Sequence, residues 1–305
     1  MSEPVLKFVD CPDPLGGHRM AYWQWGDPAC GHVVMCVHGL TRQGRDFDIL
    51  AAALRQASFD RVCVVCPDVV GRGRSDWLKD PLAYQVPTYA GDMFTLLAAL
   101  NARTLDWVGT SMGGLIGLLV AGQTNLPPHA KVRRLVLNDV GPVIEWTALQ
   151  RIGRYLGQAE VFDNVAHAAA SQLAVYRGFG PHTSEQWLKL ALPNLKPIGD
   201  GSDRVCLHYD PALAEPFKAV DAHSALQGEA LLWQLYDQIQ AQTLVLRGAE
   251  SDLLSSATAQ AMTQRGPQAR LIEFAGVGHA PTFVPDDQVQ VVVDFLIGTQ
   301  QAISA

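Results

Sequence analysis

A serine flanked by glycines stands between an apolar run and a segment of small apolar residues. The stretch Gly109-Thr110-Ser111-Met112-Gly113 fits the pattern Gly-x-Ser-x-Gly, in which a strand turns sharply into a helix and holds the serine in a strained backbone conformation. The glycines are required because a Cβ at either position would collide with the neighbouring strand or helix. Residues 104–108 and 113–122 supply the apolar strand and the helix that this turn needs. The motif therefore favours an α/β topology around Ser111.

Strand and helix patterns alternate along much of the chain. Short, continuous apolar runs at residues 32–37, 61–66, 104–108 and 133–138 are separated by helical patterns at residues 45–57, 88–102 and 113–122. The alternation resumes near the end, with strands expected at residues 242–246 and 270–274 and helices at residues 256–265 and 286–297. Such alternation predicts a mostly parallel, doubly wound sheet of about eight strands. Residues 19–25 are expected to form an edge strand.

The alternation stops between residues 142 and 239. This stretch contains helical patterns at residues 145–156, 164–176, 184–192 and 225–239, and no convincing buried strand. We expect a core of residues 1–141 and 240–305, with residues 142–239 inserted as a helical cap over the carboxyl edge of the sheet. Its aromatic side chains are candidates to line a substrate cavity, although for any one of them packing onto the core is the stronger interpretation.

The composition and charge of the chain limit the kinds of partner that it is expected to bind. The chain has a formal charge of −7, 48% hydrophobic residues and 17% charged residues, which is typical of a soluble globular protein and argues against binding to nucleic acid or an anionic membrane. The first residues show no signal-peptide pattern, and no apolar run approaches the ~18 residues that span a bilayer. Six cysteines are too sparse for a disulfide framework. We expect a cytoplasmic protein without cofactor or metal; its oligomeric state stays open.

Two loops contain residues whose role is open on sequence grounds. Residues 68–75 form a glycine-rich loop that fits neither dinucleotide-binding nor Walker A patterns, so a structural turn with its arginines paired to carboxylates is favoured. His38 precedes a glycine after an apolar run and is expected to support its loop. Arg42, a few residues later, is either an anchor for a substrate carboxylate or a brace for the loop.

A serine hydroxyl becomes a good nucleophile only when a histidine takes its proton and a carboxylate orients that histidine. His279 lies in a glycine-rich loop after the last expected strand, and Asp252 follows the next-to-last one. This satisfies the chain order serine, acid, histidine that accompanies such a turn. Asp139, which follows an earlier strand, and Glu250 remain alternatives for the acid.

Taken together, the motifs resemble those of α/β-hydrolases over nearly the full chain. They are His38-Gly39-Leu40, the loop from Asp68 to Ser75, Gly109-x-Ser111-x-Gly113, Asp252 and Gly278-His279. The resemblance implies Ser111 as nucleophile, His279 as general base and then acid, and Asp252 as the orienting acid. It also implies an oxyanion hole made by the backbone N–H groups of Leu40 and Met112, which would stabilise the tetrahedral intermediate.

The serine at position 111 narrows the chemistry that the resemblance implies. Members of similar fold with aspartate at this position are haloalkane dehalogenases and epoxide hydrolases, whereas serine implies acyl transfer. We therefore expect a hydrolase that cleaves a small to medium carboxylic ester through an acyl-enzyme at Ser111. A hydrolase of carbon–carbon bonds or a lactonase using the same residues is the alternative, and an acyltransferase or a non-catalytic binding protein is less favoured.

Overall fold

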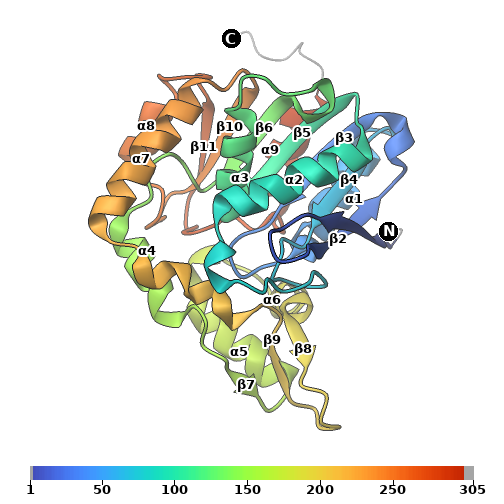
Figure 1. Cartoon of the computed structure of the whole chain (residues 1–305), viewed down its shortest axis with the longest axis vertical. Helices are drawn as coiled ribbons and strands as arrows, with labels where there is room; N and C mark the ends of the chain where they lie inside the picture. Colours follow the sequence, from blue (N-terminus) through green and yellow to red (C-terminus); the bar gives the residue numbers. More distant parts are fainter. Residues whose placement is uncertain (1–2, 299–305) are drawn as a thin grey trace.

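The computed structural model describes residues 3–298, and its centre is an eight-stranded sheet with the order β1-β2-β4-β3-β5-β6-β10-β11 (Figure 1). The six strands from β4 to β11 run parallel, and β1 and β2 are antiparallel to their neighbours. This confirms the predicted fold class. The strands are β1 (Val5–Cys11), β2 (His18–Trp25), β3 (His32–Val37), β4 (Cys63–Pro67), β5 (Thr104–Thr110), β6 (Val132–Asn138), β10 (Gln242–Gly248) and β11 (Arg270–Phe274).

Strand β2 is not the edge strand that the sequence predicts. It lies between β1 and β4, and β1 forms the edge through a register that runs from Val5 opposite Gln24 to Cys11 opposite His18. The expectation was wrong because most residues of β1 stay partly or fully exposed, so this strand lacks the apolar run of a buried one. Strand β1 is therefore held to the sheet mainly by its backbone pairing with β2, which is itself mostly buried.

Helices cover both faces of the sheet, as expected for a doubly wound fold. Helices α1 (Asp48–Ala57) and α9 (Asp286–Ile297) pack on one face, and α2 (Val86–Leu100), α3 (Met112–Ala121) and α8 (Ser256–Met262) pack on the other. Along β3, Val33 and Met35 join one core while Val34 and Cys36 join the other. The period of two explains why this strand is apolar without interruption.

The segment between β6 and β10 lies at one end of the molecule, beyond the carboxyl ends of the strands (Figure 1). Its helices are α4 (Trp146–Tyr155), α5 (Val165–Val175), α6 (Ser184–Ala191) and α7 (Ala222–Asp237). It also contains a small antiparallel sheet, β7 (Val161–Phe162), β9 (Val205–Leu207) and β8 (Leu195–Pro197). The sequence indicated only helices and no buried strand here; these three strands are mostly not buried, and strands this short show no periodicity that could predict them.

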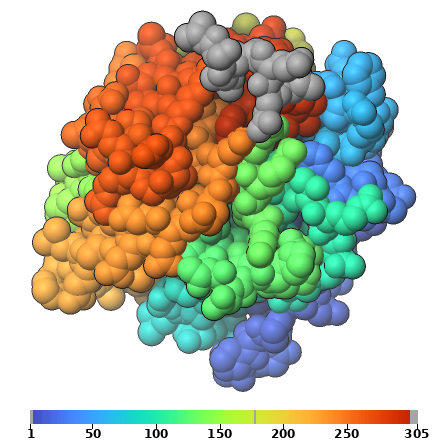
Figure 2. Space-filling view, turned by 90° about the horizontal axis from the view of Figure 1, so that it is seen from above, coloured from blue at the N-terminus to red at the C-terminus, as the bar shows by residue number. Residues whose placement is uncertain are grey.

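The last turns of α7 contact the core helices. Tyr236 is fully buried and donates its hydroxyl hydrogen bond to the carbonyl of Met262 at 2.6 Å. Figure 2 looks onto the opposite end of the molecule, where the C-terminal third (orange and red) and the N-terminal segments (blue) lie on either side of a green segment. Among residues 3–298, we find no helix whose length and apolar character would let it cross a membrane.

Candidate active site

Ser111 occupies the turn between β5 and α3. Its φ and ψ of 52° and −117° are strained for a residue with a side chain, and its N–H donates to the carbonyl of Asn138 at 2.9 Å. A Cβ added to Gly109 would collide with the carbonyl of Gly113, and one added to Gly113 would collide with that of Val37. The close approach of three backbone segments therefore explains both glycines of the motif.

The serine is the first member of a continuous hydrogen-bonded chain. Its Oγ lies 2.9 Å from Nε2 of His279, and Nδ1 of the same ring lies 2.6 Å from Oδ2 of Asp139. His279 comes from the loop after β11, and Asp139 directly follows β6. The Asp139 side chain is fully buried, whereas that of His279 keeps 15% of its surface exposed. A solvent-accessible histidine thus links the serine to a buried carboxylate.

The end of β10 and the loop after it hold the Asp139 carboxylate in place. The N–H of Gly248 donates to Oδ1 at 2.9 Å, and the hydroxyl of Ser251 donates to Oδ2 at 2.6 Å. With His279 also bonded to Oδ2, the carboxylate has partners on both oxygens. These donors fix the rotation of the side chain, so that one oxygen faces the imidazole ring.

Asp252 does not contact His279, and the sequence-based choice of this residue as its partner is corrected. Asp252 forms a two-pronged ion pair with Arg151 of α4, with distances of 2.7 and 2.9 Å. Half of its side-chain surface (49%) is exposed. Glu250, the other alternative in this loop, is exposed as well. Strand position and chain order do not separate Asp139 from Asp252, because β6 and β10 are adjacent parallel strands that end at the same edge.

Leu40 and Met112, the two residues expected to supply oxyanion N–H groups, follow β3 and begin α3 respectively. A Cβ added to Gly39 would lie 3.8 Å from the Cβ of Ser111, so the loop after β3 lies beside the serine. Within residues 3–298, neither N–H donates to a backbone carbonyl. Both groups therefore remain available to an oxygen bound near Ser111.

His38 supports the loop after β3, as expected. Its Nδ1 lies 2.7 Å from the carbonyl of Gly39, and its Nε2 accepts a hydrogen bond from the N–H of Val69 at 2.9 Å. The ring is completely buried, and burial lowers its pKa to about 3. A neutral ring that donates at Nδ1 and accepts at Nε2 satisfies both contacts, so His38 joins the loops that follow β3 and β4.

Arg72, in the glycine-rich loop, is a contributor that the sequence did not reveal. Its Nε donates to the carbonyl of Leu40 at 2.8 Å, and its Nη2 lies 3.3 Å from the sulfur of Met112. The guanidinium is fully buried and lies 4.7 Å from the centre of the Tyr89 ring. Within residues 3–298 its guanidinium bonds to the carbonyls of Leu40 and Val70 and to the Met112 sulfur but to no carboxylate, so the expected pairing is wrong for Arg72. Arg72 instead holds Leu40 and Met112, the two residues whose backbone N–H groups are free within the described chain, in position.

A pocket between the sheet edge and the insert reaches Ser111 and His279. Its walls are mostly apolar or aromatic: Leu40, Phe47, Ile152, Tyr155, Val175, Tyr176, Phe179, Leu190 and Phe283 line it. Among the insert aromatics, Tyr176 and Phe179 stack with centres 4.8 Å apart, and Trp187 stacks behind Phe179 at 6.0 Å. Tyr236, by contrast, packs in the core. The insert therefore shapes the pocket, although only part of its aromatic set does so.

Arg42 lines the same pocket, but its charge is already matched. It binds both carboxylate oxygens of Asp46 at 2.7 Å, donates to the carbonyl of Leu190 at 2.8 Å, and lies 5.4 Å from the ring centre of Tyr176. Of the two roles open on sequence grounds, these contacts favour bracing of the loop. They also connect the core to α6 of the insert.

Comparisons with known proteins agree with the observed fold. The model of the α/β hydrolase fold family matches residues 32–286. A 3-hydroxybutyrate-oligomer hydrolase from Cupriavidus necator is 48% identical over 299 residues, which are 97% of this chain and 99% of that protein. The structure of an α/β hydrolase from Novosphingobium aromaticivorans superimposes with a TM-score of 0.83 and 32% identity, covering 98% of this chain and 100% of the other. A 2-(acetamidomethylene)succinate hydrolase from Mesorhizobium japonicum is 24% identical over 87% of this chain and 88% of its own length. The chain therefore belongs to the α/β hydrolase fold family.

Proposed function

We propose that this hydrolase cleaves the ester bonds of short 3-hydroxybutyrate oligomers through an acyl-enzyme formed on Ser111. The observation that carries the proposal is the hydrogen-bonded chain from Ser111 through His279 to Asp139, whose first two members line the pocket beside the insert. The 48% identity to a 3-hydroxybutyrate-oligomer hydrolase along nearly the full length of both proteins supports the choice of substrate.

The contacts define a role for each group in the acylation step. Nε2 of His279 takes the proton of Ser111 as Oγ attacks the ester carbonyl carbon, and the resulting imidazolium is stabilised by the Asp139 carboxylate at Nδ1. The N–H groups of Leu40 and Met112 donate to the negative oxygen of the tetrahedral intermediate. His279 then gives its proton to the leaving alkoxide as the carbon–oxygen bond breaks, and the first product departs.

Deacylation repeats the same steps with water. His279 takes a proton from a water molecule as the water oxygen attacks the acyl carbon. The histidine then gives this proton to Ser111 Oγ as the acyl-enzyme ester bond breaks. The product is a free carboxylic acid, and the serine hydroxyl is regenerated. No other group is needed, because the histidine moves every proton and the backbone N–H groups stabilise both intermediates.

The pocket wall suits a chain of this substrate class. A 3-hydroxybutyrate oligomer carries one methyl branch per unit and one ester between successive units, and it is uncharged except at its carboxylate end. Leu40, Ile152 and Phe179 offer apolar surface for the methyl branches. The two arginines of the lining, Arg42 and Arg151, are paired with Asp46 and Asp252. An uncharged ester segment therefore matches the lining better than a strongly anionic substrate does.

Hydrolysis of purified 3-hydroxybutyrate dimer and trimer, followed by release of the monomer, tests the proposal directly. Parallel assays with p-nitrophenyl acetate, p-nitrophenyl butyrate and a vinylogous 1,5-diketone separate this substrate from simple esters and from carbon–carbon cleavage. We expect the highest kcat/KM on the oligomers. Turnover of the diketone alone, or of no ester, would overturn the assignment.

A fluorophosphonate probe tests the nucleophile independently of the substrate. We expect one covalent label on Ser111 in the native protein and none in the variant Ser111→Ala, which retains the remaining serines as an internal control. Labelling that persists in the variant would show that another residue is the reactive nucleophile.

A further inference from the structure

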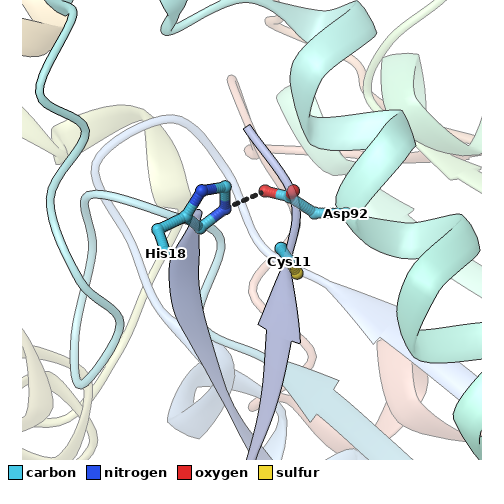
Figure 3. Close-up of side chains that lie close together, drawn as sticks. All are labelled: Cys11, His18 and Asp92. Atoms are coloured by element: carbon cyan, nitrogen blue, oxygen red, sulfur yellow. Dashed lines mark hydrogen bonds and ion pairs between the residues drawn. The ribbon is translucent and has the colours of Figure 1, made fainter. Parts of the chain in front are cut away.

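A cluster of side chains that could bind a metal ion lies away from the active site, between the β1–β2 hairpin and α2. Cys11 ends β1, His18 begins β2 directly opposite it, and Asp92 lies on α2. All three are buried, and their ligand atoms lie within 4.8 Å of one another. Figure 3 shows the His18 ring and the Asp92 carboxylate directed at each other, with Cys11 beside them.

The two ring nitrogens of His18 have different surroundings. Nε2 faces the cluster and lies 3.0 Å from Oδ2 of Asp92, whereas Nδ1 lies 3.1 Å from Oδ2 of Asp13 on the hairpin loop. A histidine that binds a metal through one nitrogen usually donates the N–H of the other to a carboxylate, which fixes the ring and its tautomer. Asp13 is in the position of that outer carboxylate.

We propose that Cys11, His18 and Asp92 bind one zinc ion through the Cys11 sulfur, Nε2 of His18 and a carboxylate oxygen of Asp92. Sulfur, imidazole nitrogen and carboxylate oxygen are together the ligand set of zinc, which takes four ligands in tetrahedral geometry. Water completes the fourth position. Magnesium and calcium require mainly oxygen ligands, and this cluster supplies too few.

Binding zinc requires the Cys11 sulfur as a thiolate and an unprotonated Nε2 on His18, so the ion displaces the thiol proton to solvent. The negative charges of the thiolate and of the Asp92 carboxylate then offset the two positive charges of the ion.

An open depression on the protein surface borders two of the three ligands. Its lining includes Cys11 and His18, the loop residue Asp13, and Arg19 and Asp76, but not Asp92. None of the three ligands lines the pocket that reaches Ser111. Zinc bound by these residues would fasten the edge hairpin to α2, at a strand, β1, that has little buried surface of its own.

Metal analysis of the full-length, tag-free protein tests the site. After incubation with zinc chloride and dialysis, we expect one zinc per chain in the native protein and its loss in Cys11→Ala and in His18→Gln. Cys206→Ala is the matched cysteine control, because Cys206 lies on β9 of the insert. His279→Ala is the matched histidine control for metal bound at the active site. Both controls should retain zinc.

Two further readouts keep the test decisive if His18→Gln fails to fold. Cobalt(II) should give a near-ultraviolet thiolate-to-metal band in the native protein and in Cys206→Ala but not in Cys11→Ala. Zinc should also raise the Tm of the native protein and leave that of Cys11→Ala unchanged. Zinc retained equally by Cys11→Ala, zinc lost only in His279→Ala, or no retained zinc at all would show that the cluster is a hydrogen-bonded network without a metal.

Discussion

The loops after β6 and β10 begin at neighbouring positions on the sheet and place their aspartates in opposite environments. Asp139 follows the last residue of β6 directly, is fully buried and contacts His279. Asp252 comes four residues after the end of β10, where the loop has already turned toward the insert, and half of its side chain is exposed beside Arg151. The comparison teaches that distance from the strand end, more than chain order, decides which carboxylate reaches the histidine.

The loop after β10 nevertheless helps to position Asp139, which follows β6. Gly248 and Ser251 donate hydrogen bonds to Asp139, so the loop that sequence reasoning chose for the acid instead orients the acid of its neighbour. Asp252 connects that same loop to α4 of the insert through Arg151. One loop therefore has two roles: it positions the buried carboxylate and it contacts the insert at its exposed end.

The largest expected effect belongs to Ser111, the residue that both loops ultimately serve. Ser111→Ala should lower kcat for 3-hydroxybutyrate dimer by about 10⁵-fold or more, because covalent catalysis is lost. Initial rates measured at saturating dimer provide the check, and an unchanged Tm and circular dichroism spectrum control for folding. Activity close to that of the native protein would exclude the proposed mechanism.

Asp139→Asn should have the next largest effect, lowering kcat by about 10³- to 10⁴-fold, because a neutral amide neither stabilises the imidazolium nor holds the required tautomer. The matched control is Asp252→Asn, which makes the same chemical change in the neighbouring loop. A larger loss from Asp252→Asn than from Asp139→Asn would reverse the comparison.

Ser251→Ala should lower kcat about tenfold, since it removes one hydrogen bond to the Asp139 carboxylate at a cost of about 1–1.5 kcal/mol. Steady-state kinetics with the dimer should show the change in kcat rather than in KM. Ser255→Ala, in the same loop region but bonded to Thr258 instead, is the control. Equal effects of the two variants would argue against a positioning role for Ser251.

The smallest effect is expected at the exposed end of the loop. Asp252→Asn should change kcat less than about threefold, because its ion pair with Arg151 is largely exposed and such pairs contribute about 0–1 kcal/mol. Raising the salt concentration should weaken what remains of this pair. Arg151→Gln, measured on the same dimer, should have an equally small effect on kcat; a hundredfold loss in either variant would assign this pair a direct role in the reaction.

The parts of the fold that depend on local patterns were predictable. Short continuous apolar runs indicated the buried parallel strands, and the glycines around Ser111 indicated the turn that holds it. Both signals could be recognised because each depends only on residues a few positions apart in the sequence. Strand β1 was not predicted because its surface is mostly exposed, and the short strands of the insert were not predicted because they contain only two or three residues.

The sequence alone determined the fold class and the positions of Ser111 and His279 at the ends of their strands. Only the tertiary structure decided that Asp139, rather than Asp252, contacts His279, and that the buried charge of Arg72 braces Leu40 and Met112. The physical reason is the same in both cases. Periodicity specifies which segments are buried, whereas the partner of a polar side chain depends on backbone groups brought together from distant strands.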